Sequence, residues 1–221
     1  TRATLVHCLE VVLRALHHQW HSPKWKDWSC ETLADAYQRF RWPFSVPVPR
    51  DRRRYAGETF AENAAVLTRL ADGLREAVRA GDPDAFFWAA VAVLRWGGVQ
   101  GNLRRLRALG PGALPSMIAA AAQLNPATAN LDRLDRVVDM NSGFSKVYSL
   151  LLDGFPIYDS RVACALASLV RLYCDECGLE PVPQPLRFGV PAHHVPHTRY
   201  VRGFPRLRAG DPERYASSNL R

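Results

Sequence analysis

The most informative part of the sequence is residues 141–165, which read NSGFSKVYSLLLDGFPIYDSRVACA. Residues 142–143 predict a turn, and the apolar spacing that follows predicts a helix over 144–152. An extended segment comes next, after which Asp159 is placed to cap a long helix over 160–176. The stretch is therefore expected to fold as a turn, a short helix, a second turn and a long helix.

The same helical spacing of apolar side chains recurs through most of the chain. It predicts further helices over 5–16, 60–78, 85–96, 102–109, 113–124 and 130–139. Alternation with a period of two is nearly absent, so we expect no β-sheet. The sequence indicates the all-α class. We expect one multi-helix unit over residues 1–221, with two lobes and the 140–177 segment in the cleft between them.

Two stretches interrupt the helical pattern. Residues 43–55 hold three prolines and four arginines. Because proline blocks helix formation and removes a backbone donor, we expect an extended linker or loop there. Residues 181–210 hold six prolines, five arginines, three histidines and no acidic residue. This composition predicts a long basic loop, which is either a nucleic-acid contact or a poorly ordered arm.

Positive charge is distributed unevenly along the chain. The net charge is +8 overall, with +5 over residues 1–55, −2 over 56–180 and +5 over 181–221. Basic segments around a near-neutral core favour a polyanionic partner, with DNA preferred, although genomic composition also produces Arg-rich surfaces. The longest apolar run, Ala85–Leu94, is far shorter than a membrane span, so no membrane partner is expected. Five irregularly spaced cysteines and no signal-peptide pattern predict a reduced, cytoplasmic protein.

Lys146 is chemically distinctive because the chain uses arginine for nearly all of its positive charge. Three of the 29 basic residues are lysines, and Lys146 stands beside apolar neighbours. A desolvated lysine can act as a nucleophile that forms a Schiff base, whereas an arginine cannot. Asp159, at the start of a helix, would stay ionised and could stabilise a developing cation. The alternative is a surface lysine and an aspartate that only caps its helix.

The segment around these two residues resembles the helix-hairpin-helix DNA glycosylase superfamily. There, a hairpin with a catalytic lysine precedes a loop and a catalytic aspartate in a pattern such as V-D-T-H-V. This chain has Gly143 to Lys146 at the hairpin and, at the second motif, Tyr158-Asp159-Ser160-Arg161-Val162. The resemblance implies that Lys146 attacks the anomeric carbon of the sugar and that Asp159 assists departure of the base.

Two features depart from that family pattern. Ser145 replaces the second hairpin glycine, and the lysine-to-aspartate spacing of 13 residues is shorter than usual. With Lys146 out of reach, a water oriented by Asp159 would attack instead, and the strand would stay uncut.

A base-excising enzyme must take its base out of the stack and hold it in a pocket. Candidate pocket or DNA-contacting residues offer aromatic faces, amide groups, a cation or hairpin backbone; they are Trp96, Gln100, Asn102, Gly143, Phe144, Tyr148, Tyr158 and Arg161, with Phe86, Phe87 and Trp88 as further aromatic candidates. The glycines of residues 97–101 would let backbone approach a ligand, but a plain helix-breaking turn explains them equally well. Other tryptophans lie among basic residues, where base stacking competes with the commoner role of closing the core; they are Trp20, Trp25, Trp28 and Trp42.

A zinc site is a second interpretation of the cysteines. Cys174-x2-Cys177 and His193-x3-His197 match a Cys2His2 spacing. Prolines between and within these pairs prevent the helix that a zinc finger needs. An iron–sulfur cluster needs four ligands, and three cysteines lie close in sequence. We therefore expect no metal and no other cofactor.

Together these features lead to a DNA glycosylase-like hydrolase or lyase that excises a modified or damaged base. One alternative is a non-catalytic helix-hairpin-helix DNA-binding protein in a repair or defence assembly. Another is a helical protein-interaction module with an incidental basic surface. Steep loss of affinity with salt separates nucleic-acid binding from this last class.

Overall fold

The computed structural model describes residues 30, 32–48, 53–125, 128, 140–191, 203–204 and 206–207. The expected helices over 5–16 and 130–139 lie outside these residues, as do three of the tryptophans among basic residues, Trp20, Trp25 and Trp28. Within the described part of the chain, no helix is long and apolar enough to cross a membrane.

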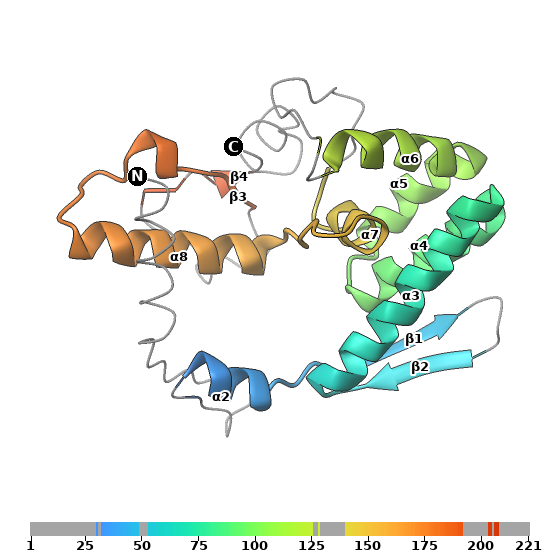
Figure 1. Cartoon of the computed structure of the whole chain (residues 1–221), viewed down its shortest axis with the longest axis horizontal. Coiled ribbons are helices and arrows are strands. Elements are labelled where there is room, and N and C mark those ends of the chain that lie inside the picture. Colours follow the sequence, from blue (N-terminus) through green and yellow to red (C-terminus); the bar gives the residue numbers. More distant parts are fainter. Residues whose placement is uncertain are drawn as a thin grey trace.

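The described residues are mostly helical (Figure 1). The helices are α2 (Leu33–Gln38), α3 (Phe60–Ala80), α4 (Pro83–Trp96), α5 (Gly101–Leu109), α6 (Ala113–Leu124), α7 (Phe144–Leu151) and α8 (Ser160–Glu176), with 3₁₀ turns η1 (Gly110–Gly112) and η3 (Gln184–Leu186). The strands are β1 (Phe44–Val48), β2 (Arg53–Gly57), β3 (Val190–Pro191) and β4 (Arg206–Leu207). The helices expected from apolar spacing within this part of the chain all form, with ends within a few residues of those predicted.

The absence of a sheet was a wrong prediction. Residues expected to form a linker over 43–55 instead pair as an antiparallel hairpin, β1 with β2, in which Val46 faces Tyr55 and Pro47 faces Arg54. Phe44 and Val46 are buried while Ser45 is exposed, so a five-residue alternation is present. A two-stranded hairpin tolerates proline because an edge strand leaves backbone donors on one side unpaired. β3 and β4 form a second, two-residue parallel pair within 181–210.

Local sequence fixes the helix starts. Thr59 and Glu62 form a reciprocal capping box at the start of α3, in which the Thr59 side chain accepts from the Glu62 amide. Asp82 caps α4 by accepting from the amides of Asp84 and Ala85. Between these helices Gly81 adopts φ 62°, which ends α3 in the left-handed conformation that glycine favours.

The largest hydrophobic cluster surrounds α4. This helix supplies fully buried side chains such as Phe86 and Leu94, and it packs against α3, α5, α6, α7 and β1. Phe44 and Val46 from the hairpin complete the cluster. A second cluster lies along α8 and consists of Ala163, Ala167, Val170, Cys174, Val182, Val190 and Phe204. Figure 1 shows α8 set apart from α3–α7 and joined to α7 by an extended segment.

The buried faces of two helices differ from those that apolar spacing predicts, which would include Phe60 in the helix over 60–78 and Leu166 in the helix over 160–176. On α3 the buried positions are Asn63, Val66, Leu70, Ala71, Leu74 and Ala77, whereas Phe60, assigned to the core, is 42% exposed. Phe60 packs instead on the rings of Tyr37 and Phe40. On α8 small residues and Arg171 face inward, while Leu166 is exposed. Apolar spacing finds the helix, but the neighbours decide which side is covered.

Candidate functional site

Lys146 is a buried cation at the start of α7. It is 3% exposed, and its Nζ donates to the carbonyl oxygen of Ser142 at 2.7 Å. The same Nζ donates to Asp159 Oδ2 at 3.2 Å. Lys146 is therefore no surface charge, and the two residues singled out from the sequence lie in direct contact.

Asp159 performs two tasks with its two oxygens. Oδ1 accepts from the backbone amides of Arg161 and Val162 at 2.9 and 3.2 Å, which caps α8. Oδ2 pairs with Lys146 and lies 3.9 Å from the guanidinium of Arg161. The capping role expected of an aspartate at a helix start is present, and the ion pair is added to it.

Burial and neighbouring charges shift the pKa values of Lys146 and Asp159. Burial lowers the pKa of Lys146, and Arg161 lowers it further, while the carboxylate of Asp159 opposes the shift. Burial would raise the pKa of Asp159, but the charge of Lys146 and the two capping hydrogen bonds outweigh it, so this pKa lies below its ordinary value. A carboxylate that stays ionised thus faces an amine that loses its proton more readily than a free lysine.

Two close approaches join the 97–102 loop to the α7 start. A Cβ added at Gly97 would lie 2.6 Å from Lys146 Cδ, so the lysine chain fills the space that glycine leaves. A Cβ added at Gly143 would lie 2.3 Å from Asn102 Nδ2. Each segment therefore supplies one glycine against which a long side chain of the other packs. This arrangement positions the amine of Lys146.

An aromatic and cationic row adjoins the ion pair. The guanidinium of Arg161 lies 4.3 Å from the ring centroid of Trp42, and Trp42 lies 6.5 Å from Trp96 with the rings 25° apart. Asn63, 4% exposed, accepts from Trp96 Nε1 and donates to the carbonyl oxygen of Trp42. Trp42 and Trp96 are partly buried and pack against the main core.

The other candidate pocket residues differ in their exposure. Phe144 and Tyr148 belong to the hydrophobic core and are 0% and 1% exposed, so neither ring can stack on a base as placed. Tyr158 donates to the carbonyl oxygen of Gly189 and ties the lead-in of α8 to the region before β3. Gln100 is exposed at the start of α5 and has no side-chain capping hydrogen bond. Of the further aromatic candidates, Phe86 is also fully buried.

The hairpin offers its backbone amides to its own chain. Asn141 Oδ1 accepts from the amides of Gly143 and Phe144, each at 2.9 Å, and the Asn141 carbonyl accepts from Ser145. The Lys146 amide donates to the carbonyl of Gly143. A hairpin that binds phosphate needs such amides to be available. These four are satisfied internally, which is a further departure from the helix-hairpin-helix pattern.

Residues essential to this geometry escaped the sequence analysis. Asn63 occupies a position of the buried face of α3, and a polar residue at apolar spacing is a signal for it. Gly97 was noted as part of a loop, but the steric need for glycine depends on Lys146, 49 residues later. The Ser142 carbonyl gives no sequence signal, since every residue has one.

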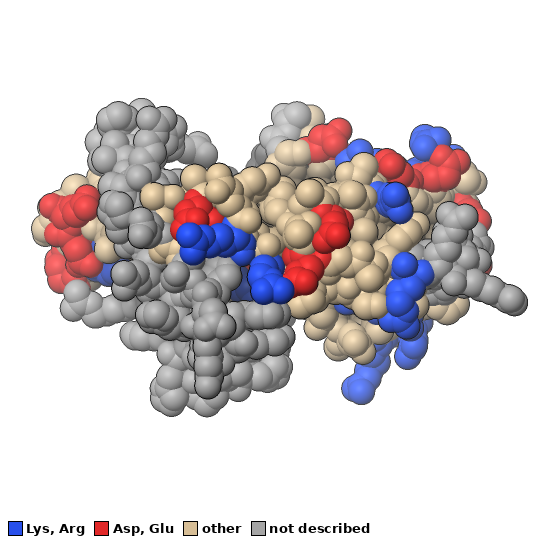
Figure 2. All heavy atoms as spheres, turned by 90° about the horizontal axis from the view of Figure 1, so that it is seen from below, with Lys and Arg blue, Asp and Glu red and all other residues tan. Residues whose placement is uncertain are grey.

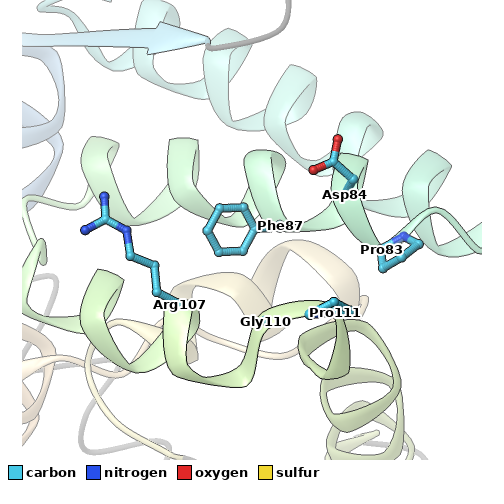
Figure 3. Close-up of a pocket in the computed structure, with 6 residues that line it drawn as sticks. All are labelled: Pro83, Asp84, Phe87, Arg107, Gly110 and Pro111. Atoms are coloured by element: carbon cyan, nitrogen blue, oxygen red, sulfur yellow. The ribbon is translucent and has the colours of Figure 1, made fainter.

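No metal centre accompanies the pair within the described residues, where no three His, Cys, Asp or Glu side chains lie close enough to hold an ion. The two cysteines of the possible zinc motif differ in environment: Cys174 is buried and Cys177 exposed. His193 and His197 lie outside the described residues. A shallow groove of about 270 Å³ lies elsewhere, lined by residues of α4, α5 and η1 (Figure 3). It contains neither Lys146 nor Asp159.

Comparison with known proteins adds no assignment. No family model, curated protein or solved structure matches the chain.

Proposed function

We propose that this protein is a DNA glycosylase-like enzyme in which Lys146 and Asp159 carry out base excision. The observation that supports it is the buried ion pair, with a lysine amine 3.2 Å from a carboxylate. Burial that lowers a lysine pKa is a recognised way of activating an amine nucleophile. The carboxylate provides negative charge where a sugar would develop positive charge.

The proposed step needs no reactant beyond Lys146, Asp159 and the substrate. The neutral amine of Lys146 forms a bond to the anomeric carbon while the bond from that carbon to the base breaks. The base leaves with the bonding electron pair and takes up the proton that the attacking nitrogen gives up. The bond from the anomeric carbon to the ring oxygen then breaks, the ring oxygen takes up the second proton of that nitrogen, and an imine between the sugar and Lys146 remains. Asp159 stays ionised throughout and stabilises the positive charge that builds on the sugar. Because Lys146 is 3% exposed, substrate binding has to open its contact with the 97–102 loop.

The non-catalytic alternative is less well supported. A helix-hairpin-helix module binds DNA through hairpin amides, and those of residues 143–146 already have partners in Asn141 and Gly143. A protein that only bound DNA would have no need of a desolvated lysine, since burial of an ammonium group is costly. The lysine therefore favours chemistry over simple binding.

Borohydride trapping tests the proposal directly. The protein is incubated with duplexes that each carry one modified base or an abasic site, and borohydride reduces any imine to a stable adduct. We expect one adduct, abolished in Lys146→Gln. Asp159→Asn should retain binding and lower base release by about 10²-fold or more, as loss of one electrostatic stabiliser does.

The scarcity of lysine supplies a matched control. Lys24 and Lys26 are the other two lysines, so a Lys24→Gln/Lys26→Gln variant removes the remaining lysine ammonium groups and keeps Lys146. It should trap as well as the unmodified protein. Base release that survives in Lys146→Gln but is lost in Asp159→Asn would replace amine attack with water attack. Activity unchanged in both variants would refute the assignment of this site.

A further inference from the structure

A stretch of the chain that precedes Lys146 and Asp159 carries positive charge without acidic residues. Residues 85–131 contain four arginines and no aspartate or glutamate. Three of the arginines, Arg104, Arg105 and Arg107, lie on α5 and are exposed, whereas the remaining one, Arg95, is partly buried. The next helix, α6, carries no charged residue. Carboxylates contributed by this part of the sequence therefore cannot neutralise α5.

Three exposed arginines elsewhere in the described chain are paired with carboxylates. Arg39 pairs with Asp35, Arg79 with Glu76, and Arg41 with Glu58. On the face drawn in Figure 2, some basic and acidic side chains adjoin, while the basic side chains at its lower right have no acidic neighbour in view. Asp84 lines the same groove as Arg107, but Figure 3 shows Phe87 between them.

The position of α5 links this charge to the candidate site. Asn102, in the first turn of the helix, packs against Gly143, and Gly97 just before the helix packs against Lys146. Arg104 and Arg107 stand one helical turn apart and follow Asn102 by two and five residues. A polyanion that reached Lys146 from this side would lie along α5.

We propose that the exposed arginines of α5 form a docking surface for the sugar–phosphate backbone of a nucleic-acid duplex. The occupant follows from charge complementarity: guanidinium groups bind phosphates in a forked geometry. The α5 surface holds the duplex while the Lys146 site acts on one nucleotide. The action of Lys146 on the held nucleotide rests on the proposed function, but duplex binding through α5 does not depend on that function.

The salt dependence of duplex binding measures how many phosphate contacts the α5 arginines make. A fluorescein-labelled 20-base-pair DNA duplex is titrated by anisotropy at several salt concentrations, and log Kd is plotted against log salt concentration. Each lost phosphate contact reduces the slope by about 0.9. Arg104→Gln/Arg107→Gln should therefore flatten the slope by about 1.8.

A control removes the same charge elsewhere. Arg39→Gln/Arg79→Gln eliminates two exposed arginines, each paired with a carboxylate, and should leave the slope nearly unchanged. Equal effects of the two double variants, or no binding by the unmodified protein at low salt, would overturn the docking surface. Equal affinity for polyglutamate would overturn nucleic acid as the occupant. An RNA duplex in parallel shows which backbone is preferred.

The same protein set separates this inference from the proposed chemistry. Lys146→Gln should keep the full salt slope, because Lys146 is buried. If no substrate is trapped yet the α5 variants flatten the slope, the docking surface stands and the proposed chemistry fails. If the unmodified protein and Arg104→Gln/Arg107→Gln both trap substrate at saturating duplex but have the same salt slope, the proposed chemistry stands and the α5 docking surface fails.

Discussion

Two aspartates cap two helices of this protein in the same way, but their second carboxylate oxygens have different surroundings. Asp82 caps α4, and Asp159 caps α8, each with one carboxylate oxygen that accepts from two backbone amides at 2.9–3.2 Å. Opposite the second oxygen of Asp159 stands the buried amine of Lys146. Identical local chemistry thus serves a plain helix start in one place and a candidate active site in the other.

The second residue of each helix sharpens the contrast. Asp84 stands there in α4, where a negative charge suits the positive end of the helix dipole. Arg161 stands there in α8, a cation at the unfavourable end. Arg161 is held by the ring of Trp42 and lies near Asp159. Arg161 thus departs from the usual charge preference of a helix start while contacting the ion pair, whereas Asp84 follows that preference.

The largest expected difference is in the cost of removing each carboxylate. Asp159→Ala leaves Lys146 as an uncompensated buried charge and should lower the free energy of unfolding by about 3–5 kcal/mol. Asp82→Ala should cost about 1 kcal/mol, the loss of a helix cap. Urea denaturation of both variants measures this. Adding Lys146→Met to Asp159→Ala should recover part of the loss, and equal costs at the two caps would contradict the comparison.

The close approach at Gly97 gives the next largest effect. Gly97→Ala places a methyl group 2.6 Å from Lys146 Cδ, and overpacking of this kind costs about 1–3 kcal/mol. It should also reduce borohydride trapping more than duplex binding, because the amine is displaced. Gly101→Ala is the matched control, since open space surrounds its Cβ position and its effect on unfolding should be neutral or favourable. Similar losses in both variants would show that Gly97 has no positioning role.

Stability should depend on pH through the ion pair. The pKa of folded Asp159 lies below its ordinary value of 3.8, so its contribution is present above that pH and is lost as pH falls through the folded pKa. Lys146 also has a lowered pKa, so stability should rise with pH as its ordinary value of 10.5 is approached. Each slope is at most about 1.4 kcal/mol per pH unit.

Variants assign these slopes to their residues. Asp159→Asn should flatten the acid region, and Lys146→Met should flatten the alkaline one, whereas Asp82→Asn should retain the alkaline rise of the unmodified protein. Thermal unfolding in a series of buffers provides the comparison. An alkaline rise that persists in Lys146→Met would assign it to another group.

The smallest effect is expected at Arg161. Arg161→Gln removes a cation–π contact of about 0.5–1 kcal/mol and relieves an unfavourable dipole interaction of about 0.3–1 kcal/mol. The two nearly cancel, so the free energy of unfolding should change by less than about 0.5 kcal/mol. Base release should fall, because Arg161 contributes to the lowered pKa of Lys146. A loss of stability well above this limit would make Arg161 a structural residue.

The sequence determined the helices and their starts because these depend on neighbouring residues. Apolar spacing and capping side chains act within a few positions, so α7, α8 and the Asp159 cap were all predictable. The short hairpin was missed because its prolines outweighed an alternation of five residues, and strand pairing is non-local. The buried faces of α3 and α8 were misplaced for the same reason: they depend on which elements pack there.

For the candidate site, too, the sequence indicated some features and the tertiary structure decided the others. Lysine scarcity and the position of Asp159 singled out two residues 13 apart. Only the tertiary structure brought Lys146 Nζ to 3.2 Å from Asp159 Oδ2, buried the amine and placed Gly97 against its methylene chain. It also removed Phe144 and Tyr148 from the candidate pocket by burying them in the core. Desolvation and distance act through space, so a property such as the lowered pKa of Lys146 exists only once distant segments have packed.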